Sequence, residues 1–306
     1  MTAALIARVL VDSPLPQLDR LFDYAIPESL RDAAMPGVRV RVPLRSAGRI
    51  ADGYLVELAA PGDYAGALSE LDSVVSSVRV LAPEVWTLAR RASERAAGSV
   101  IDIVRLAVPG RQVRVEKAYL ADGPGEQLSV VEVPAIQGYG PHVIEQATDL
   151  NERLAIDAIP LVREVSAGIW AGTWAVTLAA AAASTVAGGR SAILAVPDYR
   201  DQEQLEAALR AILPPERIVR LDARQSNPDR YRAFLRCLGD QPLVIVGNRS
   251  VVYAPAARLG LIAVWDDGDP LHSEPLSPYV HTRDAALLRQ EQQDCALIVM
   301  GHTRST

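Results

Sequence analysis

Lysine and cysteine are both scarce in this chain of 306 residues, and each scarcity narrows the classes of function. Lys117 is the single lysine, so nearly all of the basic residues are arginines. Cys237 and Cys295 lack the close spacing of a metal-binding cluster and are typical of buried, reduced thiols. A phosphate-binding loop that relies on lysine is therefore hard to build from this sequence, and we expect no zinc site.

Long, uniformly apolar runs are also missing. The opening segment MTAALIARVLVD carries Arg8 and Asp12 among its apolar residues, which is unlike a signal peptide. The longest apolar stretch, residues 171–187, is mostly alanine with threonine and serine and is typical of a buried helix. The net charge of −6 gives no general attraction to nucleic acid, although an acidic total permits a local basic face. We therefore expect a cytoplasmic protein with no membrane partner.

Residues 1–80 alternate apolar and polar side chains, as half-buried antiparallel strands do. Proline and glycine turns separate the predicted strands, which lie at residues 4–11, 38–43, 53–58 and 71–80. A small β-barrel or sandwich fits this length. Residues 83–108 predict two helices, the first with Pro83 in its first turn and the second beginning after Gly98.

Aromatic and arginine side chains come close together in this β-rich part. Phe22 and Tyr24 flank Asp23, and Arg39 and Arg41 share one face of a predicted strand. Arginines hold phosphates and aromatic rings stack on bases, so this combination suits a nucleic-acid end or a single strand. A solvated strand face above core aromatics explains the same pattern, and the residues alone leave both interpretations open.

From residue 166 the pattern changes to alternating strands and helices, which predicts a doubly wound parallel sheet. Strands are predicted at 191–196, 217–221, 243–246, 259–265 and 296–300, and helices at 171–187, 200–213, 228–238 and 280–292. In residues 243–269, each of two strands is followed by a polar cluster, which would lie at the carboxyl edge of the sheet, where ligands bind. Between the halves, VRVEKAYL (113–120) and LSVVEV (128–133) predict strands, and residues 141–156 predict a helix.

Several long segments resemble the PriA family of replication-restart helicases. The segments PLPQLDRLFDYAIPESL (14–30) and PGVRVRVPL (36–44) are similar to the family's domain that binds the 3′ end of a nascent strand. The segments VIVGNRSVVYAPAARLGLIAVWDDGD (244–269) and YVHTRDAALLR (279–289) are similar to its helicase motor. The resemblance implies an α/β protein: a small β-rich DNA-binding domain at 1–110, a linker or small module at 111–165, and a RecA-like doubly wound helicase lobe at 166–306.

In the first domain the resemblance implies a pocket for a terminal nucleotide and a surface for backbone phosphates. The implied DNA-binding residues are Phe22, Asp23 and Tyr24 for the nucleotide, and Arg39, Arg41 and Arg45 for the phosphates. The carboxylate of Asp23 would accept a hydrogen bond from the 3′-hydroxyl. Asp72 stands where the family has a lysine, which would weaken phosphate binding.

In the motor, the chain departs from the family where ATP hydrolysis needs particular side chains. The family's phosphate loop ends in Gly-Lys-Thr, whereas residues 168–175 read GIWAGTWA, with Trp174 about where the lysine should be. Trp265 takes the place of the aspartate that holds Mg²⁺, and residues 301–305 read GHTRS in place of the family's Gly-Ser-Ala-Thr-Pro. The remnants of the nucleotide and catalytic sites are Gly168, Gly172 and Thr173, and Asp266 and Asp267.

The resemblance therefore implies a DNA-binding replication-restart protein that recognises stalled forks through the 3′ end, without helicase or ATPase activity. ATP and Mg²⁺ serve the family, but neither is expected as a cofactor here, and the family's zinc-binding cysteines and second lobe have no counterpart in these residues. Forks, 3′ ends, single strands, and primosome or single-strand-binding proteins are the implied partners. Two alternatives stay open: an active ATP-dependent 3′-to-5′ helicase, and a protein-interaction remnant, which Asp72 favours.

Overall fold

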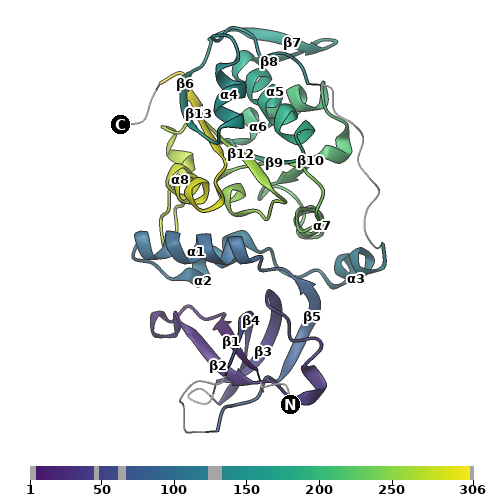
Figure 1. Ribbon diagram of the computed structural model, residues 1–306, viewed down its shortest axis with the longest axis vertical. Helices are drawn as coiled ribbons and strands as arrows, with labels where there is room; N and C mark the ends of the chain where they lie inside the picture. The colour runs from purple at the N-terminus through teal and green to yellow at the C-terminus, as the bar shows by residue number, and fades with distance from the viewer. Residues whose placement is uncertain (1–4, 45–47, 61–66, 123–132, 304–306) are drawn as a thin grey trace. The chain divides into compact units, whose positions relative to one another are not determined.

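The computed structural model describes residues 5–44, 48–60, 67–122 and 133–303. The chain divides into two compact units, Met1–Val108 and Pro109–Thr306, and each is treated by itself below (Figure 1). In the parts of the chain that the structure describes, no helix is long and apolar enough to cross a membrane.

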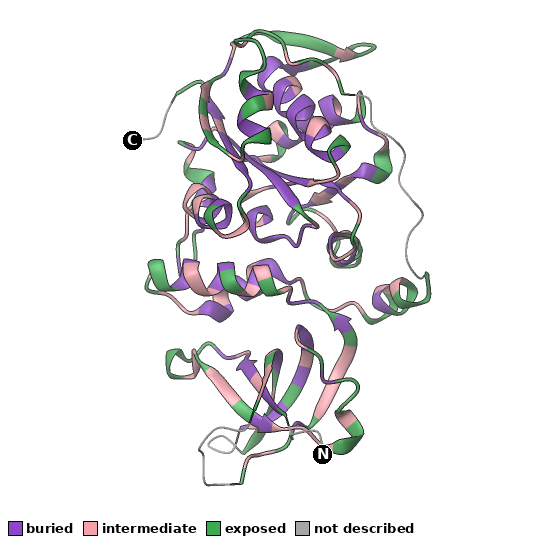
Figure 2. Ribbon diagram, in the orientation of Figure 1, coloured by how far each residue is buried: buried purple, intermediate pink, exposed green. Residues whose placement is uncertain are grey.

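The first unit is built on a five-stranded antiparallel sheet with the order β2-β1-β4-β3-β5. The strands are β1 (Ile6–Val11), β2 (Leu21–Ala25), β3 (Val38–Leu44), β4 (Arg49–Ala59) and β5 (Ser73–Arg79). In β3 the apolar side chains are buried and the intervening ones are not, which is the period-2 pattern that the sequence predicts (Figure 2). The predicted β-rich N-terminal region is confirmed, although β2 was not among the predicted strands.

Two helices follow the sheet, as predicted: α1 (Pro83–Arg95) and α2 (Val100–Ala107). Asp19, in the segment before β2, is bound to both. Its Oδ1 accepts from the backbone N–H of Val100 at 3.0 Å, and its Oδ2 lies 3.4 Å from Nη1 of Arg90. Because a carboxylate that caps a helix start and pairs with an arginine is held at both oxygens, the segment leading into β2 is fixed in place.

The second unit is built on a six-stranded sheet with the order β10-β11-β9-β12-β13-β6, in which every neighbouring pair is parallel. The strands are β6 (Arg153–Asp157), β9 (Ser191–Ala195), β10 (Ile218–Leu221), β11 (Val244–Gly247), β12 (Leu259–Trp265) and β13 (Ala296–Gly301). β9, β11 and β12 are buried along their whole length, as central strands of a parallel sheet are. The predicted parallel-sheet region is confirmed.

Helices cover both faces of this sheet, with α4, α5 and α6 on one side and α7 and α8 on the other (Figure 1). Their bounds are α4 (Val143–Asp149), α5 (Thr173–Ala187), α6 (Tyr199–Arg210), α7 (Asn227–Cys237) and α8 (Thr282–Gln293). The alanine-rich α5 is buried on nearly all sides and lies in the main core cluster with the inner strands. Small side chains let this helix approach the sheet closely, so the alanine run belongs to the core of the unit.

Two predictions between the halves were wrong. Residues 113–120 form a helix, α3 (Val113–Asp122), rather than a strand. Their alternation is misleading because the one buried side chain is Glu116, which accepts hydrogen bonds from Tyr231 of α7 and from Arg111. The predicted helix at 141–156 ends with α4, because Asn151 takes a left-handed conformation (φ 56°), and the chain then enters β6 at the edge of the main sheet.

Two further differences concern short segments. A two-stranded hairpin of β7 (Val162–Ser166) and β8 (Ile169–Gly172) precedes α5, so the helix predicted from residue 171 begins at Thr173. Of the strand predicted at 128–133, only Val133 lies within the described residues.

Candidate nucleic-acid interface

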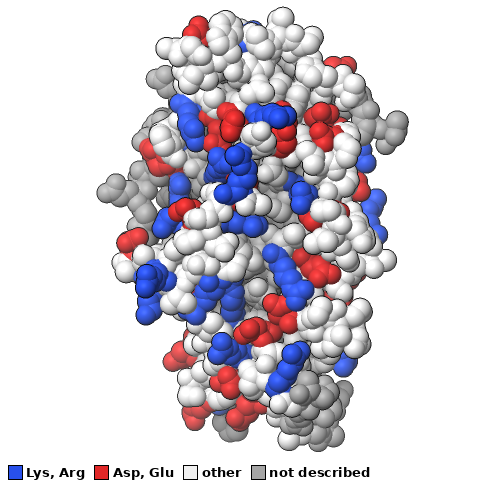
Figure 3. Space-filling model, turned by 180° about the vertical axis from the view of Figure 1, so that it is seen from behind, with Lys and Arg blue, Asp and Glu red and all other residues white. Residues whose placement is uncertain are grey.

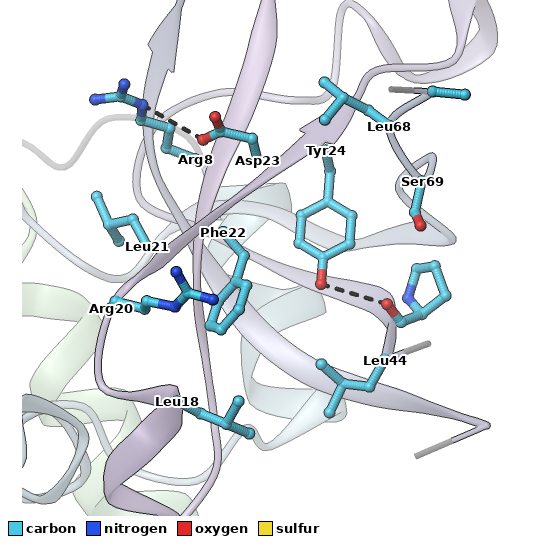
Figure 4. A pocket seen from close by; sticks show the side chains of 12 residues that line it. Arg8, Leu18, Arg20, Leu21, Phe22, Asp23, Tyr24, Leu44, Leu68 and Ser69 are labelled. Atoms are coloured by element: carbon cyan, nitrogen blue, oxygen red, sulfur yellow. Dashed lines mark hydrogen bonds and ion pairs between the residues drawn. The ribbon is translucent and has the colours of Figure 1, made fainter. Parts of the chain in front are cut away.

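A cavity of about 640 Å³ lies beside β2 in the first unit (Figure 4). Its walls come from β1, from β2 with the segment before it, from the end of β3, and from the segment 67–69. The lining residues are Arg8, Leu18, Arg20, Leu21, Phe22, Asp23, Tyr24, Pro43, Leu44, Ala67, Leu68 and Ser69. The cavity thus includes all three residues predicted for the terminal nucleotide.

Phe22 and Tyr24 share one face of β2, but their rings are placed differently. Tyr24 is buried, and its hydroxyl donates to the carbonyl oxygen of Pro43 at 3.3 Å. Burial raises the pKa of Tyr24, so the phenol stays protonated and keeps this bond at neutral pH. Phe22 is only half-buried. Tyr24 therefore builds the wall, and Phe22 is the aromatic ring that the cavity offers to a ligand.

The guanidinium of Arg20 lies 4.7 Å from the centroid of the Phe22 ring (Figure 4). A cation over an aromatic face is attracted by the ring's quadrupole, which helps to hold the side chain in place. Arg20 follows Asp19, the residue anchored to α1 and α2. The backbone that carries Arg20 is therefore fixed, and the cavity combines a positive charge with a ring in one wall.

Asp23 points to the other face of β2, where it meets Arg8 of β1. Nε of Arg8 lies 3.5 Å from Oδ1 of Asp23, and Nη1 of Arg8 donates to Oε1 of Glu57 at 2.8 Å. The side chain of Asp23 is 37% exposed. It therefore presents a carboxylate at the edge of the cavity that solvent or a ligand can reach.

The segment 67–71 closes the cavity from the side of Tyr24. The backbone N–H of Ala25 donates to the carbonyl of Ser69 at 2.9 Å, and the N–H of Leu71 donates to the carbonyl of Ala25 at 3.0 Å. These two bonds hold the side chains of Leu68 and Ser69 at the cavity wall (Figure 4). Ser69 adds a hydroxyl group to the wall.

The predicted phosphate-binding arginines are placed differently. Arg39 and Arg41 lie on the less buried face of β3, and the cavity lining does not include them. Arg39 lies 6.0 Å from the ring centroid of Tyr54, and Nε of Arg41 donates to Oδ1 of Asp52 at 3.3 Å. Arg45 falls outside the described residues. A role for these arginines in binding phosphates stays a prediction.

Asp72, which was predicted to stand where the family has a lysine, is also outside the cavity lining. Its Oδ2 accepts from the hydroxyl of Ser73 at 3.0 Å.

Acidic and basic side chains are interspersed over the face shown in Figure 3, so the net charge of −6 is not concentrated there.

A second group of predicted residues meets at the carboxyl edge of the parallel sheet. Trp174, in the first turn of α5, stacks on Trp265, the last residue of β12, with ring centroids 4.1 Å apart and an interplanar angle of 10°. Each is about 4% exposed. The ring of His302 meets Trp265 edge-on, with centroids 5.3 Å apart. Trp174, Trp265 and His302, which come from three separate segments of the sequence, therefore form one aromatic cluster.

The residues predicted to be remnants of a phosphate loop make hydrogen bonds within the protein. The N–H of Gly168 donates to Glu164, and the N–H of Gly172 donates to Oε1 of Gln204 at 2.9 Å. Both the N–H and the hydroxyl of Thr173 donate to the carbonyl of Leu161. Backbone donors of this kind are the groups with which a phosphate loop binds its ligand, and here they already have partners.

The two aspartates predicted to be remnants of the catalytic site directly follow Trp265 of the aromatic cluster in sequence. Asp266 has a left-handed backbone conformation (φ 50°), and Asp267 is buried with its Oδ2 3.3 Å from Nη1 of Arg283. Across the described residues, no group of three or more histidine, cysteine or acidic side chains could hold a metal ion.

Comparisons with known proteins match both units. Residues 8–109 match the PriA family described as 3′DNA-binding domain (3′BD). The chain is 38% identical over 295 residues to the probable replication restart protein PriA of Mycobacterium tuberculosis (strain CDC 1551 / Oshkosh), which covers 95% of this chain and 43% of the relative. The chain is a PriA-type protein. The corresponding protein of Mycobacterium leprae is also 38% identical, with 95% of this chain and 44% of the relative covered.

More distant PriA proteins match a shorter part. The replication restart protein PriA of Bacillus subtilis is 28% identical over 118 residues, which are 39% of this chain and 14% of the relative. This PriA-type chain spans less than half the length of the mycobacterial relatives that it matches.

In this PriA-type chain, the region matching the 3′ DNA-binding family contains every residue of the cavity lining. Sequence reasoning missed three polar lining residues: Arg8, Arg20 and Ser69. Arg20 lies two residues before Phe22, and an extended strand would place both side chains on one face. That spacing was a usable signal. Arg8 and Ser69 reach the cavity only through the pairing of β1 with β2 and of Ala25 with the segment 69–71.

Proposed function

We propose that this chain binds DNA by taking the 3′ end of a strand into the cavity beside β2, and that it acts in replication restart without hydrolysing ATP. The observation that carries the proposal is the cavity itself, which has Phe22, Arg20 and Asp23 among its lining residues and lies inside the region that matches the 3′ DNA-binding family. The mycobacterial relatives are named as probable replication restart proteins, which supports the cellular role.

The chemistry of the cavity suits a terminal nucleotide. A base can stack on the half-buried ring of Phe22, and the guanidinium of Arg20 can pair with the phosphate on the 5′ side of that nucleotide. The Asp23 carboxylate is a hydrogen-bond acceptor and favours a hydroxyl group at the end of the strand over a phosphate, which it would repel. A volume of about 640 Å³ is enough for one nucleotide with its hydration.

The second unit supports a RecA-like lobe. Its parallel sheet with helices on both faces is the architecture that the resemblance implies, and β6 and α4 from residues 111–165 are part of that unit. We therefore propose a DNA-binding domain at residues 1–110, followed by one lobe in which residues 111–165 join 166–306.

Loss of ATPase activity rests on the aromatic cluster. By the family resemblance, Trp174 and Trp265 stand where the family has a lysine and a Mg²⁺-holding aspartate, and their rings are stacked. The N–H groups of Gly168, Gly172 and Thr173 are bonded inside the protein. These three residues do not fit the phosphates of a nucleotide, because their N–H groups are already bonded and the described segment 168–175 contains no lysine to replace the water around the phosphates.

Two other functions are weighed against this one. An active helicase would have to bind its nucleotide without the family's phosphate loop. The aromatic cluster argues against this, because its stacked rings leave little room for the phosphates. A protein-interaction remnant would have lost DNA binding as well. Asp72 was the residue that favoured it, but Asp72 is not part of the cavity lining. Primosome and single-strand-binding proteins are proposed as partners on the family resemblance alone.

The proposal is tested with labelled single-stranded DNA in two forms of equal sequence and length, one linear and one circular. Fluorescence anisotropy on the whole chain should show tighter binding of the linear form, because only that form has an end. Phe22→Ala should remove the difference, and Leu15→Ala, an exposed residue outside the cavity lining, should preserve it. Equal binding of linear and circular DNA by the unaltered protein would contradict end recognition.

A further inference from the structure

Three charged side chains form a row across three neighbouring strands at the edge of the strand-end cavity. Arg8 on β1 is paired directly opposite Asp23 on β2, and on its other side opposite Glu57 on β4. Because directly paired residues of antiparallel strands point to the same face, the sheet register itself brings the three side chains together. A register shift in the pairing of β1 with β4 follows immediately after Arg8.

The one cation is shared unequally between the two carboxylates. Nη1 of Arg8 makes a hydrogen bond of 2.8 Å to Glu57, whereas its Nε lies 3.5 Å from Asp23. The side chains of Arg8, Asp23 and Glu57 are 43%, 37% and 48% exposed. Glu57 thus forms the shorter contact with the guanidinium. The carboxylate of Asp23 lies close to the same positive charge, and its exposed surface can still accept a hydrogen bond from another donor.

This row of charges determines what a DNA end meets at Asp23. Together the three groups carry one net negative charge, which a 3′-phosphate would experience as repulsion and a 3′-hydroxyl would not. Arg8 weakens the repulsion, and Glu57 limits how far Arg8 can do so. Arg8 lines the cavity, whereas the lining does not include Glu57.

We propose that Arg8 and Glu57 are the residues that set the selectivity of the cavity for the terminal group of the strand, by adjusting the charge that Asp23 presents. The proposal rests on the 3′-end recognition argued above and assigns roles to two residues that the sequence patterns did not indicate. Arg8 acts on Asp23 directly, and Glu57 is a positioning residue that acts through Arg8.

The measured quantity is the selectivity ratio, the Kd for a 3′-phosphorylated oligonucleotide divided by the Kd for the same oligonucleotide with a 3′-hydroxyl. Arg8→Gln removes the shielding cation and should raise the ratio. Glu57→Gln releases Arg8 toward Asp23 and should lower it. Exposed ion pairs contribute up to about 1 kcal/mol, so each change in the ratio should be about twofold to fivefold. Opposite shifts from two neighbouring substitutions are a result that loss of structure alone does not produce.

Two further variants complete the test. Asp23→Asn removes the charge and should bring the ratio close to one. Arg31→Gln breaks an exposed ion pair with Glu28, outside the cavity lining, and should leave the ratio unchanged. The urea midpoint of each variant shows whether the sheet is intact.

The outcomes separate this inference from the proposed function. If Asp23→Asn removes the selectivity while Arg8→Gln and Glu57→Gln leave the ratio as it is, or shift it in the same direction, the inference is wrong and end recognition stands. If the unaltered protein does not distinguish the two oligonucleotides, or Asp23→Asn has no effect, end recognition through Asp23 fails and the inference fails with it.

Discussion

The indole rings of Trp174 and Trp265 lie 4.1 Å apart and nearly parallel at the carboxyl edge of the parallel sheet. They come from two segments about ninety residues apart, and we propose that each takes the place of a residue that ATP hydrolysis requires in the family. The two rings cover one another and each is about 4% exposed, so the stack is part of the buried packing of the second unit.

The stack should therefore contribute to stability. Trp174→Ala or Trp265→Ala should each lower the free energy of unfolding by about 3 to 5 kcal/mol, because a large buried side chain is lost and its partner ring is uncovered. Urea unfolding followed by circular dichroism measures this. Trp170→Ala is the matched control, because Trp170 is 59% exposed and should cost under about 1 kcal/mol. Equal effects at all three positions would show that the stack has no special role.

We also expect no ATP turnover that depends on DNA. Phosphate release should stay at the background of a protein-free reaction, with and without single-stranded DNA, if the two rings occupy the places of the catalytic lysine and aspartate as proposed. Asp267→Asn serves as the internal check on any residual signal. Turnover that disappears in this variant would mean that the remaining acidic residue is catalytic, and the chain would then be an active motor.

The stability of the second unit should depend on pH through Asp201. Burial, followed by the charge of Asp198, raises the pKa of Asp201 to about 6, although a hydrogen bond from Trp265 opposes the shift. The pKa of Asp201 is higher in the folded than in the unfolded protein, so the folded protein binds this proton more tightly. Proton binding therefore stabilises the fold at low pH, and this contribution is lost as the pH rises through about 6. Asp201→Asn should therefore stabilise the protein at about pH 7.5 by on the order of 1 kcal/mol, after allowing for solvent screening.

The same substitution should have little effect near pH 4, where the proton is bound in the folded state. The comparison is the urea midpoint of the two proteins at each pH. A gain in stability that is equal at both pH values would exclude titration of Asp201 as its cause.

Arg20 and Arg41 are expected to differ in their contribution to DNA binding. Arg20 lies over Phe22 inside the cavity, whereas Arg41 pairs with Asp52 on the less buried face of β3. Arg20→Ala should weaken binding of 3′-ended single strands. It should also lower the slope of log K against log salt concentration by an amount that corresponds to about one released counterion. Arg41→Ala should weaken all DNA more uniformly. Titrations at several salt concentrations measure both slopes, and an unchanged slope for Arg20→Ala would remove its guanidinium from the phosphate contacts.

The sequence predicts most of the parallel sheet because its strands are short, buried and bounded by turn residues. Leu259–Trp265 is a strand with the predicted ends, and β9, β11 and β13 differ by one residue at most at either end. Prediction failed where burial does not follow hydrophobicity. In α3 the buried residue is a glutamate, and β6 is an edge strand with exposed side chains at alternate positions. Neither pattern contains the apolar signal on which strand and helix prediction depends.

The candidate site was predicted in part for a similar reason. Phe22, Asp23 and Tyr24 are adjacent in sequence, and the cavity lining includes all three. Arg8 lies on β1 and Glu57 on β4, and they approach Asp23 because β1 pairs with both β2 and β4. No local sequence pattern predicts which strands pair. The meeting of Trp174 with Trp265 likewise depends on how α5 and β12 are placed in the sheet. Local composition identifies such residues one at a time, and tertiary structure decides which of them meet.

The most direct test of 3′-end recognition compares a synthetic fork whose leading strand ends in a 3′-hydroxyl with the same fork ending in a 3′-phosphate. Equilibrium anisotropy titrations would use the unaltered chain and Asp23→Asn, without nucleotide. We predict tighter binding of the hydroxyl fork by the unaltered chain, and loss of that preference in Asp23→Asn. Equal affinity of the unaltered chain for both forks, or a preference that survives in Asp23→Asn, would contradict recognition of the strand end by this cavity.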